Sequence, residues 1–215
     1  MPLYKIITIN DQTTAYFWQI TEAISDLFKA VSLKDTSLFR LEKMKSESHQ
    51  KGFLAVRMLL QHIGYTDYDL HYDAFGKPHL KSVSNPNDTF FISISHSHSF
   101  SCICISKEQI GIDIEILKDK TLKIASRFLD VKHLEALSKG DQIKKATVIW
   151  GVKEAIFKIK NEKGISFPEH IFEDEFHLND GNCSAQLHFN NQISFYKIFF
   201  YSLENYIFVC AFENN

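Results

Sequence analysis

Two acidic residues alternate with isoleucines in a short segment near the middle of the chain. Residues 110–116 read Ile-Gly-Ile-Asp-Ile-Glu-Ile, and successive side chains of a β-strand point to opposite faces. The isoleucines therefore predict one buried face, while Gly111, Asp113 and Glu115 share the other, with the two acids about 7 Å apart. Carboxylates this close repel each other unless a cation lies between them, and Mg2+ accepts carboxylate and phosphate oxygens as ligands. An ordinary amphipathic strand with a solvated acidic face is the alternative interpretation.

A third acid lies on a predicted helix further along the chain, at residues 142–160. Trp150, Glu154, Phe157 and Lys158 recur at spacings that place them on one face, beside the apolar stripe that the helix buries. The Glu154 carboxylate could complete a three-acid metal site, and the Lys158 ammonium could meet phosphate oxygens. The alternative is a surface Glu–Lys pair, worth only about a few tenths of a kcal/mol.

A polar strand end precedes the acidic segment. Residues 90–99 run from an apolar strand into a turn that contains Ser95, His96 and His98. Hydroxyls and exposed amides at such a position can hydrogen-bond phosphate oxygens, and a protonated imidazole adds positive charge. A zinc site is disfavoured because no cysteine or third histidine lies nearby at metal-ligand spacing. A solvated turn is the alternative.

Basic residues of the first half offer further contacts for an anion. Gly76 and Pro78 predict a turn that presents Lys77. A predicted helical region upstream is locally basic, and most of its cations are expected to be solvated, although one or two could meet a phosphate. These cations are Arg40, Lys43, Lys45, Lys51 and Arg57.

The predicted elements that position these residues fall into two similar halves. In the first half we expect a strand at 4–9, helices at 17–31 and 37–63, and strands at 70–72, 89–95 and 100–106. In the second half we expect a strand at 110–116, helices at 121–127, 131–138 and 142–160, and strands at 185–189, 193–202 and 206–212. Both halves read as strand, helices and three strands, which predicts an α+β fold of two similar subdomains, residues 1–108 and 109–215. An active site shared by such halves is expected in the cleft between them.

Composition narrows the class of protein. A formal charge of -2 over 215 residues gives no basic field of the kind that nucleic-acid binders show. No apolar stretch approaches the roughly 20 residues that cross a bilayer, and the first residues lack the pattern of a signal peptide. The four cysteines form no CxxC pair and are expected to be free thiols. We therefore expect a cytoplasmic protein that binds neither nucleic acid nor membrane.

The order and spacing of these motifs, across roughly residues 50–167, resemble the phosphopantetheinyl transferase superfamily. The resemblance is to its larger type, named after the surfactin synthetase activator, in which one chain carries two similar subdomains. The motifs are Gly76-Lys77-Pro78, Ile94-Ser95-His96-Ser97, Gly111-Ile112-Asp113-Ile114-Glu115, and Trp150-x-x-Lys153-Glu154-Ala155-x-x-Lys158.

The resemblance implies a role for each of these motifs. Asp113, Glu115 and Glu154 would hold Mg2+, and Lys158 would contact phosphate and assist proton movement. The nucleotide and phosphate portion of coenzyme A would be bound by Lys77, Ser95 and His96, with Arg57 at a position where the family often has a cofactor-contacting arginine. Two features depart from the family pattern and bear on the cofactor contacts, namely Gly151 in place of a common serine or threonine, and the second histidine, His98.

The implied reaction is that of a holo-[carrier protein] synthase. A serine of an apo acyl or peptidyl carrier protein attacks the β-phosphate of coenzyme A, receives the 4′-phosphopantetheine group and releases 3′,5′-ADP. The general base would be Glu154 or a metal-bound water. Fatty-acid, polyketide and peptide carriers all remain open as partners, and a monomer is expected.

Two other functions use the same residues. A metal-dependent phosphoesterase would hydrolyse coenzyme A or a related diphosphate with the same three acids. A non-catalytic module would bind coenzyme A or a carrier protein without turnover. The presence of all three acids together with Lys158 favours the transferase, because binding alone does not require the whole set.

Overall fold

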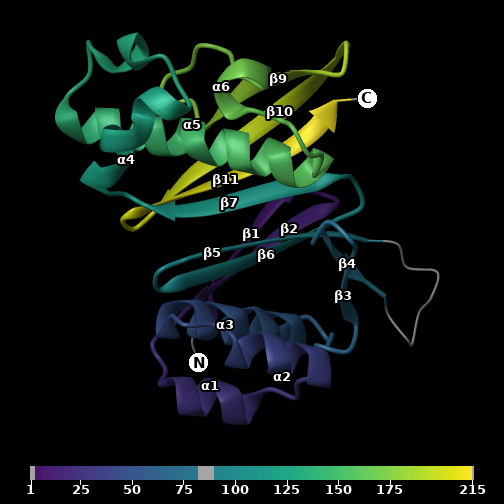
Figure 1. Cartoon of the computed structure of the whole chain (residues 1–215). Helices are drawn as coiled ribbons and strands as arrows, with labels where there is room; N and C mark the ends of the chain where they lie inside the picture. The colour runs from purple at the N-terminus through teal and green to yellow at the C-terminus, as the bar shows by residue number, and fades with distance from the viewer. Residues whose placement is uncertain (1–2, 82–89, 215) are drawn as a thin grey trace. The chain divides into compact units, whose positions relative to one another are not determined.

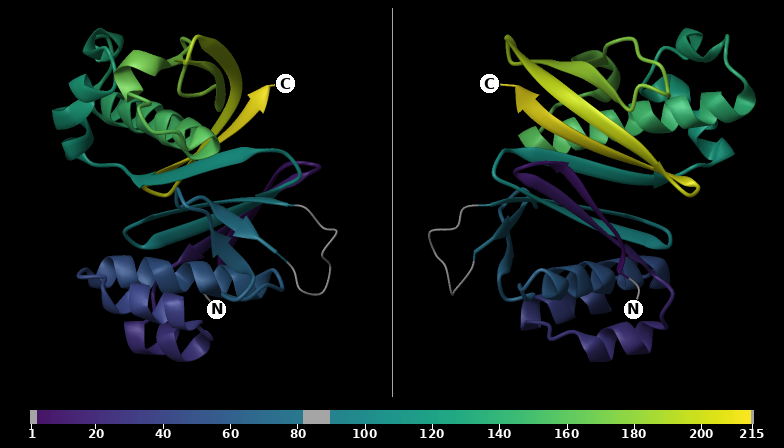
Figure 2. Two further views of the ribbon diagram at one scale, coloured as in Figure 1. Left: turned by 45° about the vertical axis from the view of Figure 1, so that its right-hand side comes forward. Right: turned by 180° about the vertical axis from the view of Figure 1, so that it is seen from behind.

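The computed structural model of the chain describes residues 3–81 and 90–214. Contacts within the chain divide it into two compact units, Met1–Glu108 and Gln109–Asn215. In each unit, helices cover one face of an antiparallel sheet (Figures 1 and 2). The expected α+β class is confirmed. No helix within the described residues is long and apolar enough to cross a membrane.

The first unit, here called unit 1, is built on a four-stranded sheet with the order β1-β2-β6-β5. Its apolar core lies between this sheet and α3, where Ala55 and Leu59 pack with Ile92 and Ile103. A separate two-stranded hairpin pairs β3 with β4. The elements are β1 (Leu3–Asn10), β2 (Thr13–Gln19), α1 (Ile24–Ala30), α2 (Asp35–Glu42), α3 (Glu47–His62), β3 (Leu70–Tyr72), β4 (Pro78–Leu80), β5 (Phe91–Ser97) and β6 (Phe100–Ser106).

The start of unit 1 differs from the sequence prediction. The helix expected at 17–31 is wrong in its first part, because β2 continues to Gln19 and α1 begins only at Ile24. Burial alternates with a period of two from Thr13 to Phe17, and β-branched and aromatic side chains favour such a pleated surface. The helix expected at 37–63 is divided into α2 and α3. Of the strand expected at 89–95, Thr89 lies outside the described residues.

The second unit, here called unit 2, is built on a five-stranded sheet with the order β7-β11-β10-β9-β8. Its longest helix, α5, has 22 residues, begins after a Ser138 cap and ends at Asn161 in the left-handed conformation. The elements are β7 (Ile110–Ile116), α4 (Asp119–Ile124), two 3-10 turns (Ala125–Arg127 and Val131–Leu134), α5 (Lys139–Lys160), α6 (Phe167–His170), β8 (Ile171–Glu173), β9 (Asn182–Phe189), β10 (Gln192–Leu203) and β11 (Tyr206–Asn214).

Two glycines let α5 lie directly on the sheet of unit 2. A Cβ atom on Gly111 of β7 would be 1.9 Å from the backbone oxygen of Ala155 in α5. A Cβ atom on Gly151 of α5 would be 2.6 Å from Cγ2 of Val209 in β11. Any side chain at either position would separate helix and sheet, so these glycines set the distance across which groups of α5 and β7 can meet.

The two units share one arrangement of strands. In unit 1 the last strand, β6, pairs antiparallel with β2 and β5, and α3 lies between β2 and β5 in the sequence. In unit 2 the last strand, β11, pairs antiparallel with β7 and β10, and α5 lies between them in the sequence. The same three-stranded motif with one long helix therefore occurs twice. Unit 1 adds β1 beside β2, whereas unit 2 adds β9 and β8 beside β10.

Candidate functional site

The acidic strand has the predicted two-faced structure. Ile110, Ile112 and Ile114 of β7 are buried on one face. The other face meets α5, as the close approach of Gly111 to that helix shows. Asp113 is only 4% exposed on this face. A buried carboxylate requires a compensating positive charge or hydrogen bonds.

Lys158 of α5 supplies positive charge to this strand. Its Nζ atom donates to Oδ1 of Asp113 at 2.9 Å and to the backbone oxygen of Ile112 at 2.9 Å. The Lys158 side chain remains 29% exposed, whereas that of Asp113 is 6% exposed. The ammonium is thus held at the edge of the site, where solvent or a ligand can still reach it.

Glu154 joins the same cluster from one helical turn earlier in α5. Burial raises the pKa of its carboxyl to about 6, and the negative charges of Asp113 and Glu115 also raise it, while the Lys158 ammonium lowers it. Three carboxylates and one ammonium therefore interact electrostatically. Among the described residues, however, no three acidic, histidine or cysteine side chains are close enough to form a ready-made metal site.

A pocket of about 230 Å³ opens beside Glu115. It combines apolar surface with hydroxyl groups and two lysines, so it could hold an elongated ligand with both apolar and polar groups. Its other lining residues are Ile116, Lys118, Lys120, Thr121, Ile124, Thr147 and Trp150.

Two of the expected cofactor contacts lie next to each other on β5 of unit 1. Ser95 is 7% exposed, whereas His96 is exposed, as alternation along a strand requires. The His96 ring lies against Gly52 of α3, where an added Cβ atom would be 3.0 Å away, and 5.7 Å from the ring of His49. His49, a second imidazole near this position, was not predicted from the sequence.

Lys77 lies at the end of the turn that its sequence predicts. Oδ1 of Asp73 accepts hydrogen bonds from the backbone N–H groups of Phe75 and Lys77 at 2.8 and 2.9 Å. Gly76 has a φ of 86°, which glycine adopts without strain. The turn fixes the backbone at Lys77, whose side chain is half-buried.

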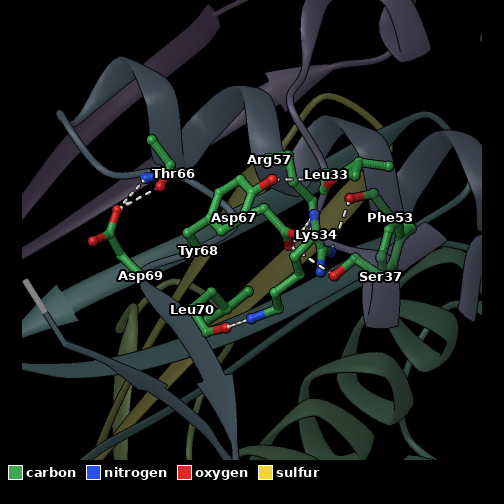
Figure 3. A network of polar contacts seen from close by, with 10 residues as sticks. All are labelled: Leu33, Lys34, Ser37, Phe53, Arg57, Thr66, Asp67, Tyr68, Asp69 and Leu70. Atoms are coloured by element: carbon green, nitrogen blue, oxygen red, sulfur yellow. Dashed lines mark hydrogen bonds and ion pairs between the residues drawn. The ribbon is translucent and has the colours of Figure 1, made fainter. Parts of the chain in front are cut away.

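Arg57 is directed into the interior of unit 1 (Figure 3). Its Nε atom donates to Oδ1 of Asp67 at 2.9 Å, and its Nη1 atom donates to the backbone oxygen of Phe53 at 3.1 Å. Asp67 also accepts from the Ser37 hydroxyl and the Lys34 backbone N–H, each at 3.0 Å. The Arg57 and Asp67 side chains are only 3% and 0% exposed, which indicates a structural role for this ion pair. The expected contact of Arg57 with coenzyme A stays a prediction.

Lys153 belongs to the motif on α5, but the sequence alone predicted no role for it. Its side chain is 3% exposed, and its ammonium lies 3.0 Å from Oε2 of Glu173. Burial lowers the pKa of this ammonium, against the opposing effect of the Glu173 carboxylate. No local pattern identifies such a partner, because Glu173 lies 20 residues away in β8.

A comparison with family models indicates the class of protein to which this cluster corresponds. Residues 109–211, which contain all three acids and Lys158, match the 4′-phosphopantetheinyl transferase superfamily. This match shows that the second unit resembles the superfamily. The resemblance read from the motifs is therefore confirmed.

Three relatives of this superfamily come from Bacillus subtilis. The 4′-phosphopantetheinyl transferase Sfp of strain 168 is 27% identical over 151 residues, which are 66% of this chain and 65% of that protein. A second 4′-phosphopantetheinyl transferase is 29% identical over 140 residues, 64% of this chain and 60% of the relative. The transferase ffp is 27% identical over 174 residues, 77% of this chain and 75% of the relative. The chain thus covers less than two thirds of the first two relatives.

Proposed function

We propose that this protein transfers the 4′-phosphopantetheine group of coenzyme A to a serine of an apo carrier protein and releases 3′,5′-ADP. The observation that carries the proposal is the superfamily match over residues 109–211, which includes Asp113, Glu115, Glu154 and Lys158. The three relatives from Bacillus subtilis are each named as 4′-phosphopantetheinyl transferases, which supports the transfer of this group. Hydrolysis of coenzyme A is the competing activity that the test below distinguishes.

Mg2+ is the metal that the cluster in unit 2 suits best. Asp113, Glu115 and Glu154 provide oxygen ligands, which a hard cation prefers. Burial and, after it, repulsion from two neighbouring carboxylates raise the pKa of Glu154, and a divalent cation would remove the repulsion. When bound, Mg2+ would neutralise charge on the pyrophosphate of coenzyme A.

The protein's own residues would supply the remaining charge and the proton acceptor. The Lys158 ammonium, held by Asp113 and the Ile112 carbonyl, is available to a phosphate oxygen on its exposed side. Glu154 is the proposed acceptor of the serine proton, because its carboxylate is a basic group on the same face of the helix as Lys158.

Coenzyme A would be bound by a wider set of residues. The pocket beside Glu115 suits the pantetheine arm, which carries both amides and apolar carbons. Lys77, Ser95 and His96 of unit 1 are proposed contacts of the nucleotide and its phosphates. The coenzyme A contact of Arg57 stays a prediction, and its guanidinium is buried against Asp67.

The cytoplasm is the proposed cellular setting. The four cysteines are free thiols, as is usual in a reducing compartment, and we place the proposed reaction in the cytoplasm. The identity of the carrier is tested by supplying fatty-acid, polyketide and peptide carriers in parallel.

Intact-mass spectrometry of an apo carrier incubated with the protein, coenzyme A and Mg2+ tests the proposal. We expect the carrier to gain one phosphopantetheine group, and the gain to disappear with a chelator. Breakdown of coenzyme A without modification of any carrier would identify a hydrolase instead. Binding of coenzyme A without either reaction would identify a non-catalytic module.

A further inference from the structure

Lys153 forms a buried polar junction on the side of α5 next to the acidic cluster. Its Nζ atom donates to the backbone oxygens of Ile171 and, at 3.4 Å, of Phe167, and it pairs with the Glu173 carboxylate at 3.0 Å. The Lys153 and Glu173 side chains are 3% and 9% exposed. The ammonium thus donates two hydrogen bonds to backbone oxygens, and the Glu173 carboxylate balances its charge.

All three partners of the Lys153 ammonium belong to one continuous segment that follows α5. Phe167 begins α6, Ile171 begins β8, and Glu173 ends β8. Aromatic contacts join the same segment to α5, because the Phe167 ring lies 5.5 Å from the Trp150 ring and 6.0 Å from the Phe157 ring, centre to centre. Lys153 therefore ties one flank of α5 to the α6–β8 segment.

Helix geometry connects this junction to the proposed catalytic groups. Adjacent residues of an α-helix are separated by about 100° around its axis, so the fixed direction of Lys153 determines the direction of Glu154. Residues four apart lie on the same face, so Glu154 and Lys158 turn together. A rotation of only about 10° would displace a carboxylate ~7 Å from the axis by roughly 1 Å, and such a displacement can cost about a hundredfold in rate.

Apolar packing alone holds the helix less firmly against rotation. The close approaches at Gly111 and Gly151 fix how near α5 lies to the sheet, but neither provides a directional bond. The directional contacts of Lys158 are made to Asp113 and Ile112, which belong to the proposed site itself. Lys153 is thus an anchor outside the reacting groups.

We propose that Lys153 and Glu173 are positioning residues that set the rotation of α5 and so hold Glu154 and Lys158 against Asp113. This inference rests on the proposed transfer reaction for its kinetic consequence, but not for its structural one. A purely stabilising role is the alternative, and replacing both members by apolar side chains of similar volume separates the two roles, since a buried ion pair can often be replaced in this way without loss of stability.

The same principle supplies the test variant. Lys153→Met alone would leave the Glu173 carboxylate buried without its partner and could unfold unit 2. The double variant Lys153→Met with Glu173→Leu removes both charges and keeps the volume. The matched control is Lys160→Met, which removes a second ion pair of α5, the one to Glu213 of β11 at 2.6 Å, where the side chains are 24% and 21% exposed.

Three measurements on the full chain distinguish positioning from stabilisation: the melting temperature, kcat for carrier modification at saturating Mg2+ and coenzyme A, and 19F NMR after labelling with 5-fluorotryptophan. The chain has two tryptophans, so Trp18 of unit 1 is an internal reference for Trp150 of α5. We expect the double variant to melt within about 5 °C of the wild type and to lose kcat about tenfold or more. Its Trp150 resonance should broaden or split, while that of Trp18 and both resonances of Lys160→Met stay sharp.

A double variant with wild-type kcat and one sharp Trp150 resonance would overturn the inference. The two proposals fail separately. If the wild-type protein modifies no carrier, the transferase proposal fails, and the Trp150 resonance of the double variant alone then decides whether Lys153 and Glu173 hold α5.

Discussion

The long helices of the two units, α3 and α5, each place a cation against a buried acid, but the two clusters differ in net charge. In unit 1, Arg57 of α3 meets Asp67, and both side chains are almost completely buried. The Asp67 carboxylate accepts two further hydrogen bonds, so one positive charge meets one well-satisfied negative charge. In unit 2, Lys158 of α5 meets Asp113 while Glu154 and Glu115 lie close enough to add two further negative charges.

This difference in net charge distinguishes the structural ion pair of unit 1 from the candidate site of unit 2. A closed, balanced pair has no capacity left for a ligand, and its main consequence is for folding. In a partly buried cluster with excess negative charge, burial and repulsion raise the pKa of one member, and capacity is left for a cation. The four predictions that follow test this contrast, beginning with the largest expected effect.

Substitution of the central acid of unit 2 should abolish transfer. Asp113→Asn removes one proposed ligand and the partner of Lys158, so we expect carrier modification to fall by about a thousandfold while the protein stays folded. Intact-mass kinetics and circular dichroism measure the two effects. The matched control is Asp119→Asn, which removes an exposed acid of α4 paired with Lys139 and should leave the rate unchanged. Equal rates for both variants would remove Asp113 from the site.

Substitution of Asp67, the acid that pairs with the long helix of unit 1, should instead lower the free energy of unfolding. Asp67→Ala leaves the buried Arg57 guanidinium without its partner, and we expect the free energy of unfolding to fall by about 3–5 kcal/mol. Urea denaturation measures the loss, and Ser37→Ala, which deletes one hydrogen bond to Asp67, should cost only about 1 kcal/mol. A rate loss in folded Asp67→Ala protein, without loss of stability, would contradict the structural role of this pair.

The third acid should contribute to the rate of the chemical step. Glu154→Gln keeps the size of the side chain but removes its charge and its ability to accept a proton, so kcat should fall by about a hundredfold at saturating Mg2+. Near-normal turnover of this variant would show that Glu154 is neither an essential ligand nor the general base.

Metal binding should depend on pH through the same residue. Because the pKa of Glu154 is raised to about 6, the protonated form is favoured below that pH, and Mg2+ binding requires the carboxylate. We expect the apparent affinity for Mg2+ to be constant above about pH 7 and to fall by up to ~10-fold for each unit below pH 6. Calorimetric titrations between pH 5 and 8 measure this dependence. A proton uptake on binding at pH 6, rather than a release, would have the wrong sign.

Much of unit 2 could be predicted from the sequence because its signals are local. The alternation of isoleucine with polar residues identified β7, and the spacing of Trp150, Glu154 and Lys158 identified one face of α5. The close approach of another backbone at Gly111 could also be anticipated, although not that Ala155 makes it.

The remaining features depend on partners distant in the sequence. Lys153 looks like a surface residue until Glu173 and the α6–β8 backbone are brought to it by folding. The sequence around Arg57 likewise did not indicate that this residue forms a buried ion pair with Asp67. The last residues of β2, 17–19, were wrongly assigned to a helix, because the pairing with β1 and β6 that completes this strand lies outside the local sequence.

Calorimetric titration of Mg2+ in the presence of coenzyme A tests most directly whether the unbalanced acids of unit 2 form the metal site. We predict one Mg2+ per chain for the wild-type protein, with binding lost or weakened at least about tenfold in each of Asp113→Asn, Glu115→Gln and Glu154→Gln. A surface variant such as Asp119→Asn should bind like the wild type. Unchanged Mg2+ binding in all three acid variants would contradict the account.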